Sequence, residues 1–360
     1  MRLFQLYFFA VWFIVCSFQL PAAEQSTRVV TDAVGRKVTI PTKINRVYST
    51  GPVGTILLYT LVPEKLVGWN YKHSEPDVKY IVPPYDKLPV VGGWYGKSNT
   101  GNLEEIINAR PDLIVSVGMT TTDTLSIATG EQVQMQSGIP VYMAESDLFK
   151  LEQTYRTLGD VLGVPERGRE LADYCAQTFQ DVQEKMKKLP PRNKRARVYY
   201  AEGFKGLETD ASGSPHSALL DWVGAVNVAD TPLLDGYGRA QVSMEQLLRW
   251  NPDIIIAGYE IGAGPGGVYN VVKNDPTWQH LAAVKNGKVY ETPQHPFNWF
   301  DRPPSVSRVL GVKWVANLLY PDIFPYDMRH EASVFYEKFY HKKLTEAELD
   351  GLLNRSLPQK

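Results

Sequence analysis

The stretch NLEEIINARPDLIV, residues 102–115, has a second copy in the chain, SMEQLLRWNPDIII at residues 243–256. Each copy begins with helical spacing and an early glutamate, reaches a Pro-Asp pair that ends the helix, and continues into an apolar run of strand character. The residues before each copy are also alike, because GGWYGK (92–97) and DGYGR (235–239) both combine glycine with an aromatic and a basic side chain. Two matched features in the same order indicate two lobes of similar structure.

Short β-rich runs alternate with stretches of helical spacing around both copies. This alternation is typical of a parallel sheet built from βα units, so the sequence predicts an α/β fold. The expected strands are 46–49, 65–69, 88–91, 113–117 and 141–143 in the first half and 197–201, 254–257 and 288–290 in the second.

A long helix is expected between the two lobes. Residues 148–189 show no strand pattern, and residues 167–188 carry apolar side chains at steps of three and four until Leu189-Pro190-Pro191 ends the helix. At 1.5 Å per residue this helix is about 33 Å long, enough to run from one lobe to the next. The expected division is an N-terminal lobe at 24–146, a linker with the helix at 147–190, a C-terminal lobe at 191–320 and an extension at 321–360 with a charged helix at 345–352.

The start of the chain differs from the rest. Arg2 precedes the apolar run Leu6–Val15, and Leu20-Pro21-Ala22-Ala23 offers small residues for cleavage, so residues 1–23 are interpreted as a secretory signal peptide. A membrane span needs roughly 20 apolar residues and is the weaker interpretation. Removal of the segment leaves Cys175 as the single cysteine, which excludes an internal disulfide and indicates a buried apolar role.

Charge and motifs exclude several classes of function. The 360 residues include 38 Lys and Arg against 39 Asp and Glu, which leaves no basic surplus for nucleic acid. Nucleophile elbows, P-loops and dinucleotide-binding glycine motifs are missing, and the six histidines lack the spacing of a zinc site. The sequence therefore predicts a protein that is not an enzyme, uses no cofactor and holds no metal directly through its side chains.

The loops expected at the carboxyl ends of the strands carry aromatic and basic side chains. Open α/β sheets bind ligands at these ends, rings stack on extended ligands, and arginine forks bind anions. The interpretation is a cleft for an anionic ligand, bulky or partly aromatic. Core packing of Trp69 and Trp94, an ion pair of Arg302 with Asp301, and a solvated Arg239 or surface His216 are the alternatives. The candidate ligand-binding residues are Thr50, Trp69, Trp94, Tyr95, Lys97, His216, Tyr237, Arg239, Trp299 and Arg302.

The chain resembles the substrate-binding proteins of bacterial ABC importers for iron complexes and vitamin B12. The resemblance runs from TDAVGR (31–36) and VTIP (38–41) through the two Pro-Asp segments. It implies two Rossmann-like lobes joined by one rigid helix, a ligand in the cleft between them, and a periplasmic protein, expected to be a monomer. It also implies that Glu104 and Glu245 dock onto basic pockets of a dimeric permease that works with an ATPase.

The identity of the ligand stays open in the sequence. The resemblance favours a ferric siderophore, because the family's iron-siderophore members use arginines and aromatic rings in the cleft, and both residue types are expected in the cleft of this chain. Residues 298–305 and 310–314 look like a branch whose members are mostly iron-complex binders. A relative of that branch handles molybdate or tungstate, which makes a compact oxyanion the main alternative, and haem or a corrinoid comes third. Outside transport, a secreted hydrolase would need Ser214 or Ser217 beside His216 and a carboxylate, and a ligand sensor would engage a membrane receptor without uptake.

Overall fold

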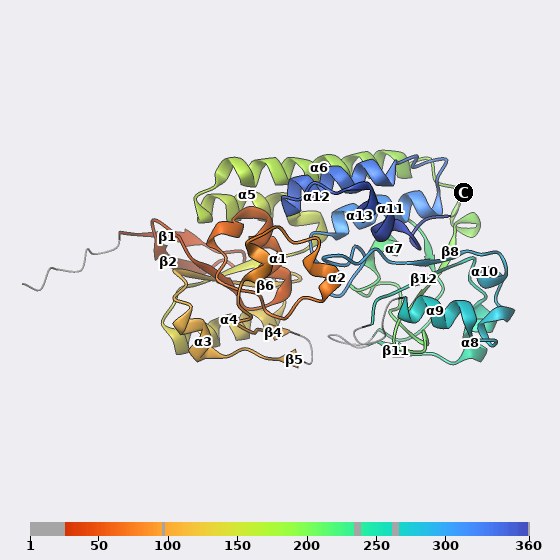
Figure 1. Cartoon of the computed structure of the whole chain (residues 1–360), viewed down its shortest axis with the longest axis horizontal. Helices are drawn as coiled ribbons and strands as arrows, with labels where there is room; N and C mark the ends of the chain where they lie inside the picture. The colour runs from red at the N-terminus through yellow and green to blue at the C-terminus, as the bar shows by residue number, and fades with distance from the viewer. Residues whose placement is uncertain (1–25, 96–97, 234–238, 261–265, 359–360) are drawn as a thin grey trace, which may run out of the picture.

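A computed structural model describes residues 26–95, 98–233, 239–260 and 266–358, and the structural statements below concern these residues. Two α/β lobes lie side by side beneath one long helix (Figure 1). The expected two-lobed α/β architecture is confirmed.

The N-terminal lobe is built on a parallel sheet with the strand order β3-β6-β7. An antiparallel pair, β1 with β2, precedes this sheet, and the short strands β4 and β5 form a separate pair. The strands are β1 (Thr27–Thr31), β2 (Lys37–Pro41), β3 (Val47–Ser49), β4 (Trp94–Tyr95), β5 (Ser98–Asn99), β6 (Leu113–Gly118) and β7 (Val141–Glu145), and the helices are α1 (Pro52–Leu61), α2 (Glu75–Val78), α3 (Leu103–Asn108) and α4 (Thr124–Ser137).

The C-terminal lobe is built on a parallel sheet with the order β10-β8-β12-β13 and a small antiparallel pair, β9 with β11. Its strands are β8 (Arg197–Ala201), β9 (Glu208–Thr209), β10 (Val226–Asn227), β11 (Ala240–Gln241), β12 (Ile254–Ala257) and β13 (Val289–Glu291), and its helices are α7 (Ala218–Trp222), α8 (Met244–Trp250), α9 (Gly267–Asn274), α10 (Ala282–Lys285) and α11 (Arg308–Leu319).

Two of the expected strands do not form. The segments 65–69 and 88–91 are extended but make only isolated bridges, Val47 with Leu66 and Trp69 with Val90. A single bridge on each side leaves no continuous ladder of backbone hydrogen bonds, so neither segment is part of the sheet.

The internal repeat is confirmed down to individual contacts. In the first copy the Arg46 guanidinium donates to the Ala109 carbonyl at the end of α3, and the Asp112 carboxylate accepts from the Arg46 amide. In the second copy Arg197 donates to the Trp250 carbonyl at the end of α8, and the Asp253 carboxylate accepts from the Arg197 amide. The same short loop therefore joins helix to strand in both lobes.

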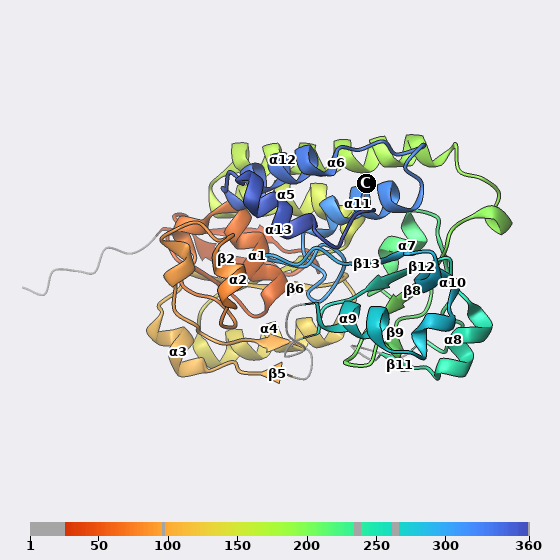
Figure 2. The ribbon, with the colours of Figure 1, turned by 45° about the vertical axis from the view of Figure 1, so that its right-hand side comes forward.

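The linker consists of two packed helices, α5 (Leu151–Leu162) and α6 (Pro165–Met186). Helix α6 is the predicted long helix, starting and ending about two residues earlier than expected, and it runs across both lobes (Figures 1 and 2). Its buried stripe includes Leu171, Cys175 and Phe179, so the expectation of a buried cysteine is confirmed.

The C-terminal extension packs against both lobes. It contains α12 (Met328–Tyr340) and α13 (Glu346–Leu353), which lie beside α6 and α11 in both views (Figures 1 and 2). The Tyr80 hydroxyl of the N-terminal lobe donates to the Glu348 carbonyl, and the indole of Trp314 on α11 donates to the Ser356 carbonyl. The extension thus ties the two lobes together from the side of the long helix.

The expected signal peptide, residues 1–23, lies outside the described residues. Among the residues that are described, no helix is both long and apolar enough to cross a membrane.

Close packing of α5 on α6 yields a test of the linker. A Cβ atom at Gly168 would lie 2.6 Å from the Tyr155 carbonyl oxygen and 2.9 Å from the Gly159 Cα. Because these are backbone atoms, Gly168→Ala should push the helices apart and lower the free energy of unfolding by about 1–3 kcal/mol in urea denaturation. Gly351→Ala on α13 is the control, since its nearest neighbour is the Tyr80 hydroxyl at 3.6 Å. It should leave stability equal or raise it by about 0.5–1 kcal/mol, and equal stabilities of the two variants would contradict the prediction.

Candidate functional site

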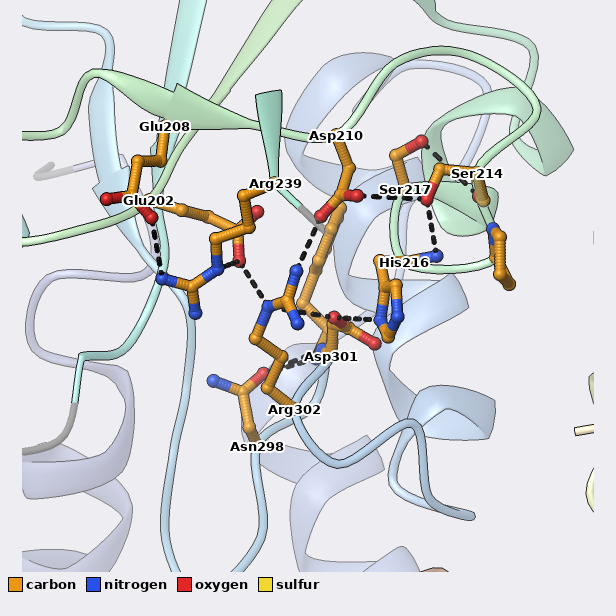
Figure 3. Close-up of polar contacts among 12 residues, drawn as sticks. Glu202, Glu208, Asp210, Ser214, His216, Ser217, Arg239, Asn298, Asp301 and Arg302 are labelled. Carbon is orange, nitrogen blue, oxygen red and sulfur yellow. Dashed lines mark hydrogen bonds and ion pairs between the residues drawn. The ribbon is translucent and has the colours of Figure 1, made fainter. Parts of the chain in front are cut away.

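A cluster of charged side chains gathers at the carboxyl ends of the C-terminal lobe's strands (Figure 3). Glu202 directly follows β8, Asp210 follows β9, and Glu260 lies beyond the end of β12. Arg239 immediately precedes β11, and Asp301 and Arg302 come from the loop between β13 and α11. This is the edge of a parallel sheet at which α/β proteins place their ligands.

Arg302 lies at the centre of three carboxylates. Its Nε is 2.6 Å from Glu202 Oε1 and 3.5 Å from Asp301 Oδ2, and its Nη2 is 2.7 Å from Asp210 Oδ2. Burial alone lowers the pKa of Arg302, but the carboxylates of Glu202 and Asp301 outweigh it and the pKa is raised overall. The guanidinium therefore stays charged.

Arg239 is paired in a similar way. Its Nε lies 3.1 Å from Glu202 Oε1, and its Nη1 lies 2.5 Å from Glu260 Oε2 and 3.4 Å from Glu208 Oε2. Glu260 also accepts from the Gly203 amide at 3.1 Å. The side chains of Arg239 and Arg302 remain 16% and 18% exposed, so a solute could still reach both.

Glu202 is the carboxylate that both arginines share, and it is completely buried. Burial raises its pKa well above the ordinary value of 4.5, Arg302 and Arg239 pull the pKa down, and nearby Asp210 raises it again. The net upward shift means that the protein favours the protonated form of this group.

His216 is a buried member of the cluster and not a surface residue. It is 2% exposed, and its Nδ1 lies 2.7 Å from Asp301 Oδ2. The hydroxyl of Ser214 donates to Asp210 Oδ1 at 3.0 Å, and that of Ser217 donates to the Ala211 carbonyl at 2.6 Å. Both hydroxyl groups thus donate to oxygen atoms and not to the imidazole of His216. This is not the arrangement of a serine nucleophile with its base. Helix α7 begins at Ala218, so His216 lies in the loop before it.

The carboxylates of Glu202, Asp210 and Asp301 lie within 4.8 Å of one another, a spacing that a hard cation would accept. Arg302, however, contacts all three of them. The group as it stands is therefore a guanidinium site, and a cation would have to displace this arginine.

The N-terminal lobe contributes a smaller polar region at the start of α1. Thr50 follows β3, is 4% exposed, and its hydroxyl donates to Ser116 Oγ at 3.1 Å. The backbone amide of Trp94 donates to the Thr50 carbonyl at 2.8 Å, and the half-buried Trp94 ring lies against Gly101, where a Cβ would come within 2.3 Å of it. Lys97 and Tyr237 lie outside the described residues, as does the side chain of Tyr95.

Two of the candidate ligand-binding residues, Trp69 and Trp299, are buried in the core. Trp69 is 3% exposed and donates from its indole to the Tyr85 carbonyl, and Trp299 is fully buried with its indole 3.2 Å from the Tyr336 hydroxyl. Both rings therefore pack in the core, which is the alternative that the sequence left open for Trp69, and almost none of their surface is exposed for stacking on a solute.

The loops at the carboxyl ends of the two lobes meet. His295 Nδ1 of the C-terminal lobe lies 2.7 Å from Asp77 Oδ1 of α2, and the Phe297 ring packs against Trp69 with centroids 6.0 Å apart. The polar residues of both lobes therefore flank one shared region of the molecule.

Sequence reasoning missed the carboxylates that pair with the arginines, namely Glu202, Glu208, Asp210 and Glu260. Their positions just beyond predicted strands were a usable signal for Glu202 and Glu260. No local sequence pattern indicates that Arg302 meets an acidic residue 100 positions away in the chain.

Glu104 and Glu245 lie away from this cluster. They occupy equivalent positions in α3 and α8, both are exposed, and both helices lie on the side of the molecule opposite α6 (Figures 1 and 2). Each is followed three residues later by an exposed apolar side chain, Ile107 at 44% and Leu248 at 39%.

Comparison with known proteins assigns the chain to a family. A solved ABC transporter solute binding protein from Sulfurospirillum deleyianum superimposes with a TM-score of 0.81 at 30% identity, over 91% of this chain and 99% of that one. The molybdate-binding protein MolA of Haemophilus influenzae is 26% identical over 87% of this chain and 91% of its own length. The Fe(3+)-citrate-binding protein YfmC of Bacillus subtilis is 25% identical over 54% of this chain and 58% of its own length. The periplasmic binding protein family matches residues 47–296, and this chain belongs to that family.

Proposed function

We propose that this chain is the solute-binding component of an ABC importer, exported to the periplasm, and that its ligand is a compact oxyanion of the molybdate or tungstate class. The observation that carries the choice of ligand is the burial of Trp69 and Trp299. Without these rings the described lining is mainly polar, which suits a small tetrahedral anion better than a large aromatic chelate. The relative that spans most of both chains is named as a molybdate-binding protein.

The proposed anion contacts come from both lobes. Thr50 and the start of α1 belong to one lobe, and Arg239 and Arg302 to the other. Helix α1 begins with Pro52, has no acidic residue in its first turn, and its N-terminus therefore favours an anion. Arginine forks supply paired N–H donors for two oxygens of the same ligand.

A ferric complex is the second candidate. The half-buried Trp94 keeps some surface for stacking, and the relative matching half of the chain is named as an Fe(3+)-citrate-binding protein. Haem and cobalamin are larger still and serve as negative probes.

A ligand panel separates these candidates. Tryptophan fluorescence and calorimetry on the mature protein should show saturable binding of molybdate and tungstate, and none of ferric citrate, a ferric catecholate, haem or cobalamin. Saturation by a ferric complex alone would keep the transport role and replace the proposed ligand.

Arg302 offers a test of the anion contact. Arg302→Lys keeps the positive charge beside three buried carboxylates but loses the planar fork, so affinity for molybdate should fall at least about tenfold. Arg249→Lys on α8 is the matched control, because the Arg249 side chain is 70% exposed. This variant should bind molybdate with the affinity of the wild type. An unchanged affinity in Arg302→Lys, with an intact thermal transition, would remove this arginine from the site.

We also propose that α3 and α8 dock onto a dimeric permease. The repeat gives each helix an exposed glutamate and an exposed apolar residue one turn later, Glu104 with Ile107 and Glu245 with Leu248. Two similar patches on two similar lobes match a partner with two similar subunits, each offering a basic group beside an apolar one.

Reversal of both charges, Glu104→Lys with Glu245→Lys, should leave molybdate affinity unchanged and strongly reduce molybdate uptake by cells that carry the importer, because the partner's basic groups are then repelled. Glu184→Lys on α6 is the control, since its side chain is 62% exposed on the opposite side. Normal uptake by the double variant would instead favour a sensor that does not transport.

A further inference from the structure

The arginine cluster carries more acid than base. Five carboxylates, those of Glu202, Glu208, Asp210, Glu260 and Asp301, face the guanidiniums of Arg239 and Arg302. When all five are ionised, an incoming dianion would meet arginines whose charge is already neutralised. For the proposed function to hold, one of these carboxylates has to take up a proton when the ligand binds.

Glu202 is the group placed to do this. Its Oε1 is shared by the two arginines, at 2.6 Å from Arg302 Nε and 3.1 Å from Arg239 Nε. Its Oε2 is buried and has no hydrogen-bond partner among the described residues, and the side chain is completely inaccessible to solvent. Carboxylate oxygens of Asp210 and Asp301 lie within 4.8 Å of Glu202, so an ionised Glu202 adds a third negative charge to a group of buried carboxylates.

The other carboxylates are less suited. Glu208 is 32% exposed, so water solvates its charge. Asp210 accepts a hydrogen bond from the Ser214 hydroxyl, Asp301 Oδ2 lies 2.7 Å from His216 Nδ1, and Glu260 accepts from the Gly203 amide. Asp301 Oδ1, like Glu202 Oε2, is buried without a hydrogen-bond partner among the described residues, but of the two arginines Asp301 contacts only Arg302, whereas Glu202 is shared by both.

We propose that Glu202 couples anion capture to protonation: the site binds its oxyanion when Glu202 carries a proton, and the ionised carboxylate holds Arg239 and Arg302 away from the ligand. This inference rests on the proposed function. In the coupled step a dianion enters, one proton from solvent adds to Glu202, and the two arginines exchange a carboxylate contact for a ligand oxygen. Burial already raises the pKa of Glu202, so the proton is taken up at modest cost.

The groups that share the environment of Glu202 come from several elements. The charged and titratable side chains are Tyr199 and Tyr200 of β8, Glu208 and Asp210 of the β9 segment, Arg239 before β11, Glu260 after β12, and Asp301 and Arg302 of the loop before α11. In addition, His216 contacts Asp301, and Arg308 interacts electrostatically with Asp301. Tyr199 and Tyr200 both have raised pKa values because of burial, so they stay neutral.

The sign of the pH effect follows directly. The complex requires the protonated form, so affinity is full at low pH and falls as pH rises through the pKa of Glu202 in the free protein. With one coupled proton the affinity falls by up to about tenfold per pH unit on the alkaline side.

The experiment is calorimetry with molybdate between about pH 6 and pH 9, a range in which molybdate remains a dianion. Each pH is measured in two buffers of different ionisation enthalpy, which counts the protons taken up. Wild type should show uptake approaching one proton at the alkaline end, and Glu202→Gln should bind with a flat pH profile and no uptake. Glu208→Gln, which removes an exposed carboxylate from the same arginine, should keep the wild-type slope.

The outcomes separate the inference from the proposed function. If wild type binds no molybdate at any pH, the proposed ligand is wrong and the inference falls with it. If wild type binds without proton uptake, or if Glu202→Gln keeps the wild-type slope, the inference alone is overturned. The proton count is made on wild type, so the test holds even if the variant folds poorly.

Discussion

One continuous apolar core connects the two lobes, and it sets how the site residues of one lobe lie relative to those of the other. The same cluster contains Val47 and Leu113 of the first sheet, Val198 and Ile256 of the second, and side chains of α6 and the C-terminal helices. Such a core is close-packed and resists deformation. The lobes therefore keep a defined relation, and only modest hinge motion is compatible with the packing.

The loop that carries Arg302 shows how this core serves the site. Phe297, Trp299 and Phe300 are each no more than 1% exposed, and they hold the backbone on which Asp301 and Arg302 follow. Trp299, which the sequence suggested as a ligand-binding residue, is thus one of three buried rings that support the loop behind the site. They position an arginine among three carboxylates.

The electrostatics of the site differ from the simple picture of bare arginines awaiting an anion. Arg239 and Arg302 are both needed to stabilise buried acids, and Glu202 lies between them. Buried charges are tolerated only when they are paired, so the cluster is organised before any ligand arrives. On the proposal above, ligand capture is an exchange of partners, in which Arg239 and Arg302 replace a carboxylate contact by a ligand oxygen.

The sequence by itself determined what depends on local patterns: the two Pro-Asp repeats, the strands 197–201 and 254–257, the long linker helix and the equivalent glutamates on α3 and α8. The strand predictions at 65–69 and 88–91 were wrong, because β-rich composition does not by itself provide a neighbouring strand with which to form a ladder of hydrogen bonds. Only the tertiary structure decided which rings are buried and which acids meet Arg239 and Arg302. The physical reason is that burial and ion pairing depend on distances between residues such as Glu202 and Arg302, which are 100 positions apart, and no local periodicity encodes such a distance.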